Sequence, residues 1–366
     1  MGFSCGIVGL PNAGKSTVFN ALTAAGSPVA PYAFCTIDPK EGVVAVPDPR
    51  LRTLAGLLHP ERTTPTTLTF VDIAGLVKGA SRGEGLGNRF LGHIREVDAV
   101  VFVLRAFEDE NVSHVAPVLD PWADLETVRT ELLLADLETV RGRLERQIKA
   151  AKVGDKEARA EVEFLESLAA HLDRGAPART RVPGSEREAA WRDGLFLLTV
   201  KPALLVANIG EGELPGGGPL VEALRTRAAA EGLAVIPVCG KLEMDLAGIE
   251  DPGERSAFMT ELGFAASALD RVVTEGYRLL ELITFYTPVG PELRAWTIPR
   301  GTTAGRAAGR IHSDMERGFI RAEITSFEDF VAAGSEARAR ERGLARAEGR
   351  DYVMQDGDVA RVHFRA

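Results

Sequence analysis

The chain has 366 residues, of which 45% are hydrophobic and 26% charged, and its formal net charge is -9. This composition is typical of a globular protein with two or three domains, and it excludes a fibrous or intrinsically disordered chain. No apolar run approaches the roughly 20 residues of a membrane span, and the start of the chain lacks the pattern of a secretory signal. We therefore expect a cytoplasmic protein that does not bind membranes.

The three cysteines, Cys5, Cys35 and Cys239, are far apart and form no C-x-x-C pair. Neither disulfides nor structural zinc are therefore predicted, and Cys239 is expected to be buried rather than reactive. The negative net charge argues against coating of nucleic acid by the whole protein, although one local basic face can still bind RNA. Composition thus leaves a ribosomal partner open.

The first predicted strand, residues 4–9, leads directly into Gly-Leu-Pro-Asn-Ala-Gly-Lys-Ser at 9–16, and helical sequence follows. This is a complete G-x-x-x-x-G-K-[ST] motif in the strand–loop–helix context that the motif requires. Such a loop binds phosphates through main-chain N–H groups and the positive end of the helix. Lys15 can reach the β and γ phosphates, and the Ser16 hydroxyl can ligate Mg²⁺. The alternative is a glycine-rich turn that carries Lys-Ser by chance, but the motif favours a nucleoside triphosphate site.

The next predicted strand, residues 67–72, ends in Asp-Ile-Ala-Gly at 72–75, the D-x-x-G pattern of GTPase-like switches. In such switches the Asp holds Mg²⁺ through water and the Gly N–H senses the γ phosphate. Thr36 precedes this motif, where a first-switch threonine completes the Mg²⁺ shell. A helix-capping or turn carboxylate is the alternative for Asp72. The predicted metal ligands are Ser16, Thr36 and Asp72, and the predicted phosphate sensor is Gly75.

Three more apolar strands are predicted at 99–104, 203–208 and 234–238, with long helical or loop stretches between the strands, which indicates a parallel α/β sheet. Residues 124–173 show helical periodicity with a turn at Gly154-Asp155. We expect an inserted helical hairpin at about 124–195. It can serve as a partner-binding arm or simply stabilise the fold, and the sequence does not decide between these roles.

The strand over 203–208 leads into Asn-Ile-Gly-Glu at 208–211, where GTP-specific proteins have Asn-Lys-x-Asp. That Asp accepts two hydrogen bonds from the guanine N1–H and 2-amino groups, whereas adenine offers neither donor. The Lys that normally covers the base is replaced by Ile209. Guanine specificity is therefore expected to be lost. The segment 239–243, Cys-Gly-Lys-Leu-Glu, follows the next strand, where the fifth nucleotide motif packs on the base.

Helical sequence over 256–282 leads to a final block that is typical of a small α+β module. Its predicted strands are 283–286, 294–298, 319–324, 352–354 and 360–364. A helix is expected near 334–346, and Asp356-Gly357 predicts a hairpin between the last two strands. The arginines between 338 and 350 can line a phosphate backbone, but the glutamates among them are equally consistent with a solvated helix.

Together these residues resemble one family closely, the Obg-related YchF group of P-loop ATPases, over nearly the whole chain. The quoted motifs are Tyr-Ala-Phe-Cys-Thr-Ile-Asp-Pro at 32–39, Asp-Ile-Ala-Gly-Leu-Val-Lys-Gly-Ala at 72–80 and Asn-x-x-Glu at 208–211. The resemblance implies a P-loop domain over 1–280 with the inserted hairpin and a TGS domain, a β-grasp module, over 281–366. It also implies hydrolysis of ATP in preference to GTP, residence in the cytosol, and association with the ribosome or a ribosomal subunit.

The same resemblance assigns residues to the site by motif position. Its nucleotide ligands correspond to Asn12, Ala13, Gly14, Lys15, Ser16, Thr17 and Ile209, and its Mg²⁺ ligands to Ser16 and Thr36. Asn208 and Leu242 are expected as further base neighbours. RNA contacts through the TGS domain are expected in addition.

Leu76 follows the D-x-x-G motif, where many GTPases place a glutamine that orients the attacking water. Leucine cannot make those hydrogen bonds, so hydrolysis is slow or another group orients the water. The candidates are His114, a monovalent cation such as K⁺ held by Asn12, and a ribosomal partner. A solvent-facing loop histidine is the alternative for His114. The expected catalytic residues are Lys15, Thr36, Gly75 and His114.

Three functions follow from these patterns. The first is a slow ATPase switch whose nucleotide state alters the loops at 34–38 and 75–87. The second is a ribosome- or RNA-binding scaffold that holds ATP as a structural ligand. The third is a conventional GTPase, which Ile209 and Glu211 disfavour but which requires only that GTP bind at least as tightly as ATP.

Overall fold

The computed structural model divides the chain into two compact units, each built from two stretches of sequence. One contains Met1–Val43 and Thr69–Val272, and the other contains Val44–Leu68 and Val273–Ala366. The residues described are 2–25, 40–73, 86–109, 118–152, 155–249, 251–264 and 266–365. Sequence patterns kept residues 44–68 within the nucleotide-binding domain, whereas in the structure they belong to the same unit as the C-terminal block.

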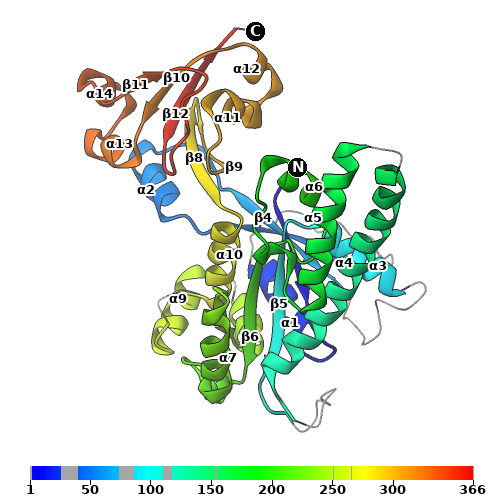
Figure 1. The fold of residues 1–366 in the computed structure, drawn as a ribbon. Helices are drawn as coiled ribbons and strands as arrows, with labels where there is room; N and C mark the ends of the chain where they lie inside the picture. The colour runs from blue at the N-terminus through cyan, green and yellow to red at the C-terminus, as the bar shows by residue number, and fades with distance from the viewer. Residues whose placement is uncertain are drawn as a thin grey trace. The chain divides into compact units, whose positions relative to one another are not determined.

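A six-stranded sheet in the order β2-β4-β1-β5-β6-β7 forms the centre of the first unit (Figure 1). The five strands expected from the sequence are present as β1 (Ser4–Val8), β4 (Thr67–Asp72), β5 (Ala99–Ala106), β6 (Ala203–Ile209) and β7 (Val235–Val238). Their pairings are parallel, as predicted. The edge strand β2 (Lys40–Ala45) was missed because it begins with Lys-Glu-Gly and buries only alternate residues.

Helices cover both faces of this sheet. Phe102, Leu104 and Leu205 share one hydrophobic core with residues of α3 (Leu86–Glu96), α4 (Pro121–Lys152) and α7 (Gly218–Ala230). Strand residues that point the other way, such as Val101 and Val103, are also fully buried. Burial on both faces explains why these strands read as continuous apolar runs. Further α-helices of this unit are α1 (Lys15–Ala25), α5 (Lys156–Asp173), α6 (Glu186–Asp193), α8 (Gly240–Ala247) and α9 (Pro252–Glu261), and α10 (Ala268–Leu279) begins in this unit.

The inserted hairpin consists of α4 and α5, which are the two longest helices described. Val140 and Phe164 belong to a separate apolar core between the two helices. The chain then returns to the sheet along α4, where the buried Asp136 carboxylate accepts hydrogen bonds from Leu198 N at 2.7 Å and from Thr199 N at 2.8 Å. Burial raises the pKa of Asp136 despite these donors. The hairpin is thus fixed to the sheet by a buried polar contact as well as by apolar packing.

The second unit has a sheet in the order β11-β10-β12-β8-β9-β3. Strands β8 and β9 form an antiparallel hairpin, and β12 pairs with β8 in parallel and with β10 antiparallel, which is the topology of a β-grasp module. The strands are β3 (Arg62–Thr64), β8 (Leu282–Val289), β9 (Glu292–Pro299), β10 (Phe319–Thr325), β11 (Arg346–Glu348) and β12 (Val359–Phe364). The helices are α2 (Pro49–Leu58), α11 (Ala304–Ile311), α12 (Ser313–Arg317), α13 (Phe327–Ala333) and α14 (Glu336–Glu341).

The contacts of α2 explain why residues 44–68 belong to this unit. Leu51 and Leu54 pack in one core with Tyr286 and Phe330. The Tyr286 hydroxyl donates to Asp48 Oδ2 at 2.6 Å, and Arg50 donates to both oxygens of Asp356 at 3.0 and 3.1 Å. These contacts join the early segment to residues more than 200 positions later in the chain.

Two expectations for the C-terminal block are wrong. Residues 352–354 form only an isolated bridge, between Thr303 and Val353, so Asp356-Gly357 does not close a hairpin. Asp356 instead accepts a hydrogen bond from Thr284 N at 2.9 Å, which ties this turn to β8. The helix near 334–346 is shorter than expected, because α14 covers only Glu336–Glu341 and Arg346 already belongs to the edge strand β11. No helix in the described parts of the chain has the length and apolar content needed to cross a bilayer.

Candidate nucleotide-binding site

The phosphate loop lies between the end of β1 and the start of α1, and two close approaches fix its shape. A Cβ on Gly9 would lie 2.3 Å from the Val103 carbonyl oxygen, and one on Gly14 would lie 2.1 Å from Asn208 Nδ2. Gly14 also has φ +88°, in the left-handed region that favours glycine. Both glycines of the motif are therefore required by backbone geometry and packing.

Lys15 is folded back over this loop. Its side chain is buried, and Nζ donates to the Leu10 carbonyl oxygen at 2.8 Å. Burial lowers the pKa of Lys15, and the negative charge of Asp72 acts in the opposite direction. A phosphate oxygen can replace the Leu10 carbonyl oxygen as acceptor, and its negative charge would stabilise the buried ammonium.

Ser16 and Asp72 fit a Mg²⁺ ion. Asp72 is the last residue of β4, next to β1 in the sheet, and its Oδ2 accepts a hydrogen bond from Ser16 Oγ at 3.2 Å. Hydroxyl and carboxylate oxygens are ligands that Mg²⁺ prefers, and it usually keeps waters and substrate phosphates as its other ligands. Among the described residues, no cluster of three or more His, Cys, Asp or Glu side chains could hold a metal alone. The predicted residues Thr36, Gly75 and His114 lie outside the described residues.

At the end of β6, Asn208 connects the phosphate loop with the start of α8. Its side chain is 6% exposed; Nδ2 donates to the Ala13 carbonyl oxygen at 3.1 Å, and Oδ1 accepts from Gly240 N at 3.1 Å. Asn208 was expected as a base neighbour. Its two hydrogen bonds give it a further role, because they hold together the two loops that would flank a nucleotide.

The other predicted nucleotide residues differ in how open they are. Asn12, Ser16 and Thr17 are exposed at the loop and the first turn of α1, whereas Ala13 is buried. Ile209 is 3% exposed and belongs to the core on the sheet, and Leu242 packs against that core while remaining partly exposed. The side chain of Ile209 therefore lies in the core rather than on an open surface, so a contact with the base would involve its main chain.

A second connection, between the turn after β6 and the start of α8, was missed in the sequence. Lys241 Nζ lies 3.0 Å from Glu211 Oε1, and the side chains are 76% and 53% exposed, respectively. The hydrogen bond with Glu211 raises the pKa of Lys241. The only signal was the position of Lys241 in the fifth-motif segment, which could not reveal its partner. Cys239, two residues earlier, is buried as expected, and burial raises the pKa of its thiol.

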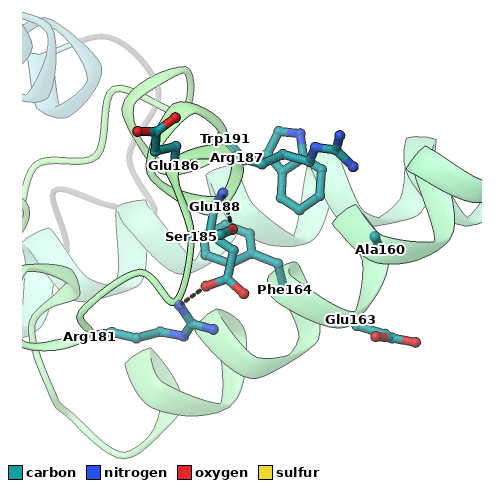
Figure 2. Close-up of a pocket in the computed structure, with 9 residues that line it drawn as sticks. All are labelled: Ala160, Glu163, Phe164, Arg181, Ser185, Glu186, Arg187, Glu188 and Trp191. Carbon is teal, nitrogen blue, oxygen red and sulfur yellow. Dashed lines mark hydrogen bonds and ion pairs between the residues drawn. The ribbon is translucent and has the colours of Figure 1, made fainter.

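A cavity of about 740 Å³ lies beside the hairpin, away from the predicted nucleotide residues (Figure 2). Figure 2 shows Arg181 facing Glu188, with which it makes a 3.1 Å ion pair. The Arg181 guanidinium also lies 4.6 Å from the centre of the Phe164 ring, and Trp191 packs near that ring. None of the residues predicted to bind nucleotide lines this cavity.

Known protein families match both the N-terminal and the C-terminal part of the chain. One matching family model, described as 50S ribosome-binding GTPase, covers residues 4–134, and another, YchF-GTPase_C, described as a protein of unknown function, covers residues 282–366. The chain is 51% identical over 364 residues to "Ribosome-binding ATPase YchF" of Escherichia coli O157:H7 and 50% identical over 367 residues to the protein of the same name in Bacillus subtilis (strain 168). Each alignment covers 100% of this chain and 99% of the relative.

A solved structure entitled "Structure of the Schizosaccharomyces pombe YchF GTPase" is also similar. It matches with a TM-score of 0.88 and 36% sequence identity, covering 99% of this chain and 97% of that chain. The similarity therefore extends over both compact units.

Proposed function

Because the chain belongs to the YchF family, we propose that it is a ribosome-associated P-loop ATPase of the cytoplasm that acts as a nucleotide-dependent switch. It binds ATP with Mg²⁺ and hydrolyses it slowly to ADP and phosphate. The observation that carries this proposal is a complete phosphate loop joined by a hydrogen bond to residues 208–211, which depart from the guanine pattern. We call residues 208–211, together with the start of α8, the base end of the site. Relatives of about 50% identity named ribosome-binding ATPases support the ribosomal partner.

The base end supports ATP over GTP. Ile209 stands where a lysine covers guanine, and its side chain lies in the core. Glu211 stands where an aspartate accepts two hydrogen bonds from guanine, and it is paired with Lys241. The Schizosaccharomyces pombe relative is named a GTPase, whereas the bacterial relatives are named ATPases. These residues favour the ATPase activity for this chain.

Each part of the chain has a separate role in this mechanism. The loop N–H groups and Lys15 bind and orient the β and γ phosphates. Ser16, Asp72 and Thr36 would hold Mg²⁺, which neutralises charge on the phosphates when bound. Gly75 senses the γ phosphate. When hydrolysis removes this phosphate, the segment that adjoins Gly75 is released.

The attacking water must be oriented by a group other than Leu76, whose side chain has no polar atom. A K⁺ ion held by Asn12 would make turnover faster in K⁺ than in Na⁺. His114 is the second candidate, and a His114→Ala enzyme with unchanged turnover would exclude it. If neither change has an effect, turnover that depends on ribosomes would assign this role to the ribosomal partner.

The C-terminal unit is proposed to contact ribosomal RNA, but the arginine cluster predicted for this role is largely engaged within the protein. Arg340 pairs with Glu323 and Glu336, and Arg350 donates to the Glu316 carbonyl oxygen. Removal of everything after residue 280 would leave Leu51 and Leu54 without their core, so truncation does not test this role cleanly. Neutralising the exposed Arg338 as Arg338→Gln is the better test, with ribosome binding measured against salt concentration.

The proposed function is tested by titrating the purified protein with non-hydrolysable ATP and GTP analogues in Mg²⁺ and then measuring phosphate release with and without ribosomes. We expect tighter binding of the ATP analogue and turnover that ribosomes stimulate. Tighter GTP binding would overturn the argument from the base end. ATP binding without turnover would instead favour a ribosome-binding scaffold in which ATP is a structural ligand.

A further inference from the structure

Two connections of different kinds join the end of β6 and the turn after it to neighbouring segments of the site. Asn208 makes the buried one, through the Ala13 carbonyl oxygen and Gly240 N. Glu211 and Lys241 make the exposed one. Glu211 is the first residue of the short 3-10 turn after β6, and Lys241 is the second residue of α8. The hydrogen bond from Gly240 N to Asn208 therefore holds the start of α8, which carries Lys241, against the end of β6, which leads to Glu211.

The position of this pair bears on base selection. Guanine is read by a carboxylate that accepts from two adjacent donors, N1–H and the 2-amino group, and so uses both of its oxygens. Lys241 lies against Oε1 of Glu211, which leaves Oε2 as the oxygen without this ammonium partner. Adenine presents a single donor group on its corresponding edge, the 6-amino group, and one oxygen suffices to accept from it.

We propose that Lys241 is a specificity-determining residue that acts through Glu211. By holding one oxygen of the carboxylate, it prevents the two-point contact that guanine needs and keeps the other oxygen for the 6-amino group of adenine. This inference rests on the proposed function, because it concerns the base choice of the same site.

The expected effect is modest because both side chains are exposed. Surface ion pairs are weak and are screened by salt, so we expect the ratio of GTP to ATP dissociation constants to change by roughly two- to fivefold when the pair is lost. ATP and GTP carry the same phosphate charge, so the ratio cancels the salt dependence of phosphate binding. The discrimination that depends on Lys241 should therefore diminish between low salt and about 1 M salt, where the screening length is about 3 Å.

The experiment measures the dissociation constants of non-hydrolysable ATP and GTP analogues, with Mg²⁺, for the wild type and five variants of the full chain, one of which is Glu211→Gln alone. Lys241→Ala should lower the GTP-to-ATP ratio, chiefly by tightening GTP binding, whereas Lys241→Arg should retain the wild-type ratio. Lys149→Ala removes an exposed lysine on α4 and serves as the matched control. Adding Lys241→Ala to a Glu211→Gln background should produce no further change in the ratio, because the partner is already gone.

The outcomes separate this inference from the function on which it rests. A wild-type protein that prefers ATP, together with an unchanged ratio in Lys241→Ala, would overturn the role of Lys241 and leave the ATPase standing. The same change in the ratio on the Glu211→Gln background would also overturn it, because the effect would not pass through Glu211. A wild-type protein that binds GTP more tightly would overturn the proposed function itself.

Discussion

The phosphate end and the base end of the candidate site are built on different physical principles. At the phosphate end, Gly14 admits no side chain and Lys15 is buried, so contacts within the fold determine the shape of the loop. At the base end, Glu211 and Lys241 are exposed, and their pairing is open to solvent. The rigid end therefore determines the class of ligand, a polyphosphate, whereas the exposed end adjusts which base accompanies it.

The largest expected effect is at the phosphate end. Gly14→Ala would place a Cβ 2.1 Å from Asn208 Nδ2 in a residue with φ +88°, so the loop must change shape. We expect affinity for both ATP and GTP analogues to fall by more than about 100-fold, which is about 2.7 kcal/mol or more. Fluorescence titration with labelled nucleotides measures this loss.

Gly142→Ala is the matched control for this substitution. Gly142 lies inside α4, and nothing lies within 4 Å of an added Cβ. Alanine in a helix interior should raise the free energy of unfolding by up to about 1 kcal/mol and leave nucleotide binding unchanged. Near-wild-type affinity in Gly14→Ala would contradict the steric account of the loop.

Asn208→Ala tests the connection between the two ends. It would leave the Ala13 carbonyl oxygen and Gly240 N without a buried partner, at a cost of about 1–3 kcal/mol for each group left unsatisfied. Denaturant unfolding should report this loss. Both nucleotides should bind more weakly while their ratio stays near that of the wild type, and a change in the ratio alone would mean that Asn208 acts on the base directly.

The buried Lys15 predicts a pH dependence of binding. Burial lowers its pKa in the folded chain below the ordinary value of 10.5, so charged Lys15 opposes folding, and this cost is relieved as pH rises from the lowered pKa towards 10.5. Nucleotide affinity should change in the opposite direction, falling by up to about tenfold per pH unit in that window, because a neutral amine does not attract phosphate.

Calorimetric titration in two buffers of different ionisation enthalpy measures the proton linked to binding. We expect proton uptake to increase as pH enters the alkaline window, since phosphate binding stabilises the charged amine. Binding that takes up no proton at any pH up to 10.5 would show that Lys15 does not titrate with the nucleotide.

The smallest effect is expected from Glu211→Asp. The shorter carboxylate restores the residue type of the guanine pattern and withdraws from Lys241, so GTP affinity should rise by a few-fold. Adding Ile209→Lys would complete that pattern but would place an ammonium at a position that is 3% exposed, and the protein should lose stability. Competition of GTP against labelled ATP measures the shift, and unchanged competition in Glu211→Asp would count against two-point reading of guanine.

The sequence predicts those features that depend on neighbouring residues, and it does not predict contacts between residues that are far apart in the chain. The parallel strands and the phosphate loop were found because burial on both faces and the steric needs of the motif appear in consecutive residues. The place of residues 44–68 was not found, because Asp48 and Tyr286 are 238 residues apart. The pairing of Lys241 with Glu211 likewise depends on loops that meet only in the folded chain. Residues 352–354 resemble a strand, yet the hydrogen bond from Thr284 N to Asp356 anchors the following turn elsewhere.

Because the second unit is built from two separate stretches of sequence, part of it is synthesised long before the rest. Arg50 leaves the ribosome 306 residues before Asp356, which at about 5–20 residues per second is roughly 15–60 s. Throughout that interval, the apolar face of α2 lacks the strands of its own core. The second unit therefore cannot complete the core around α2 until the strands that cover this face have been synthesised.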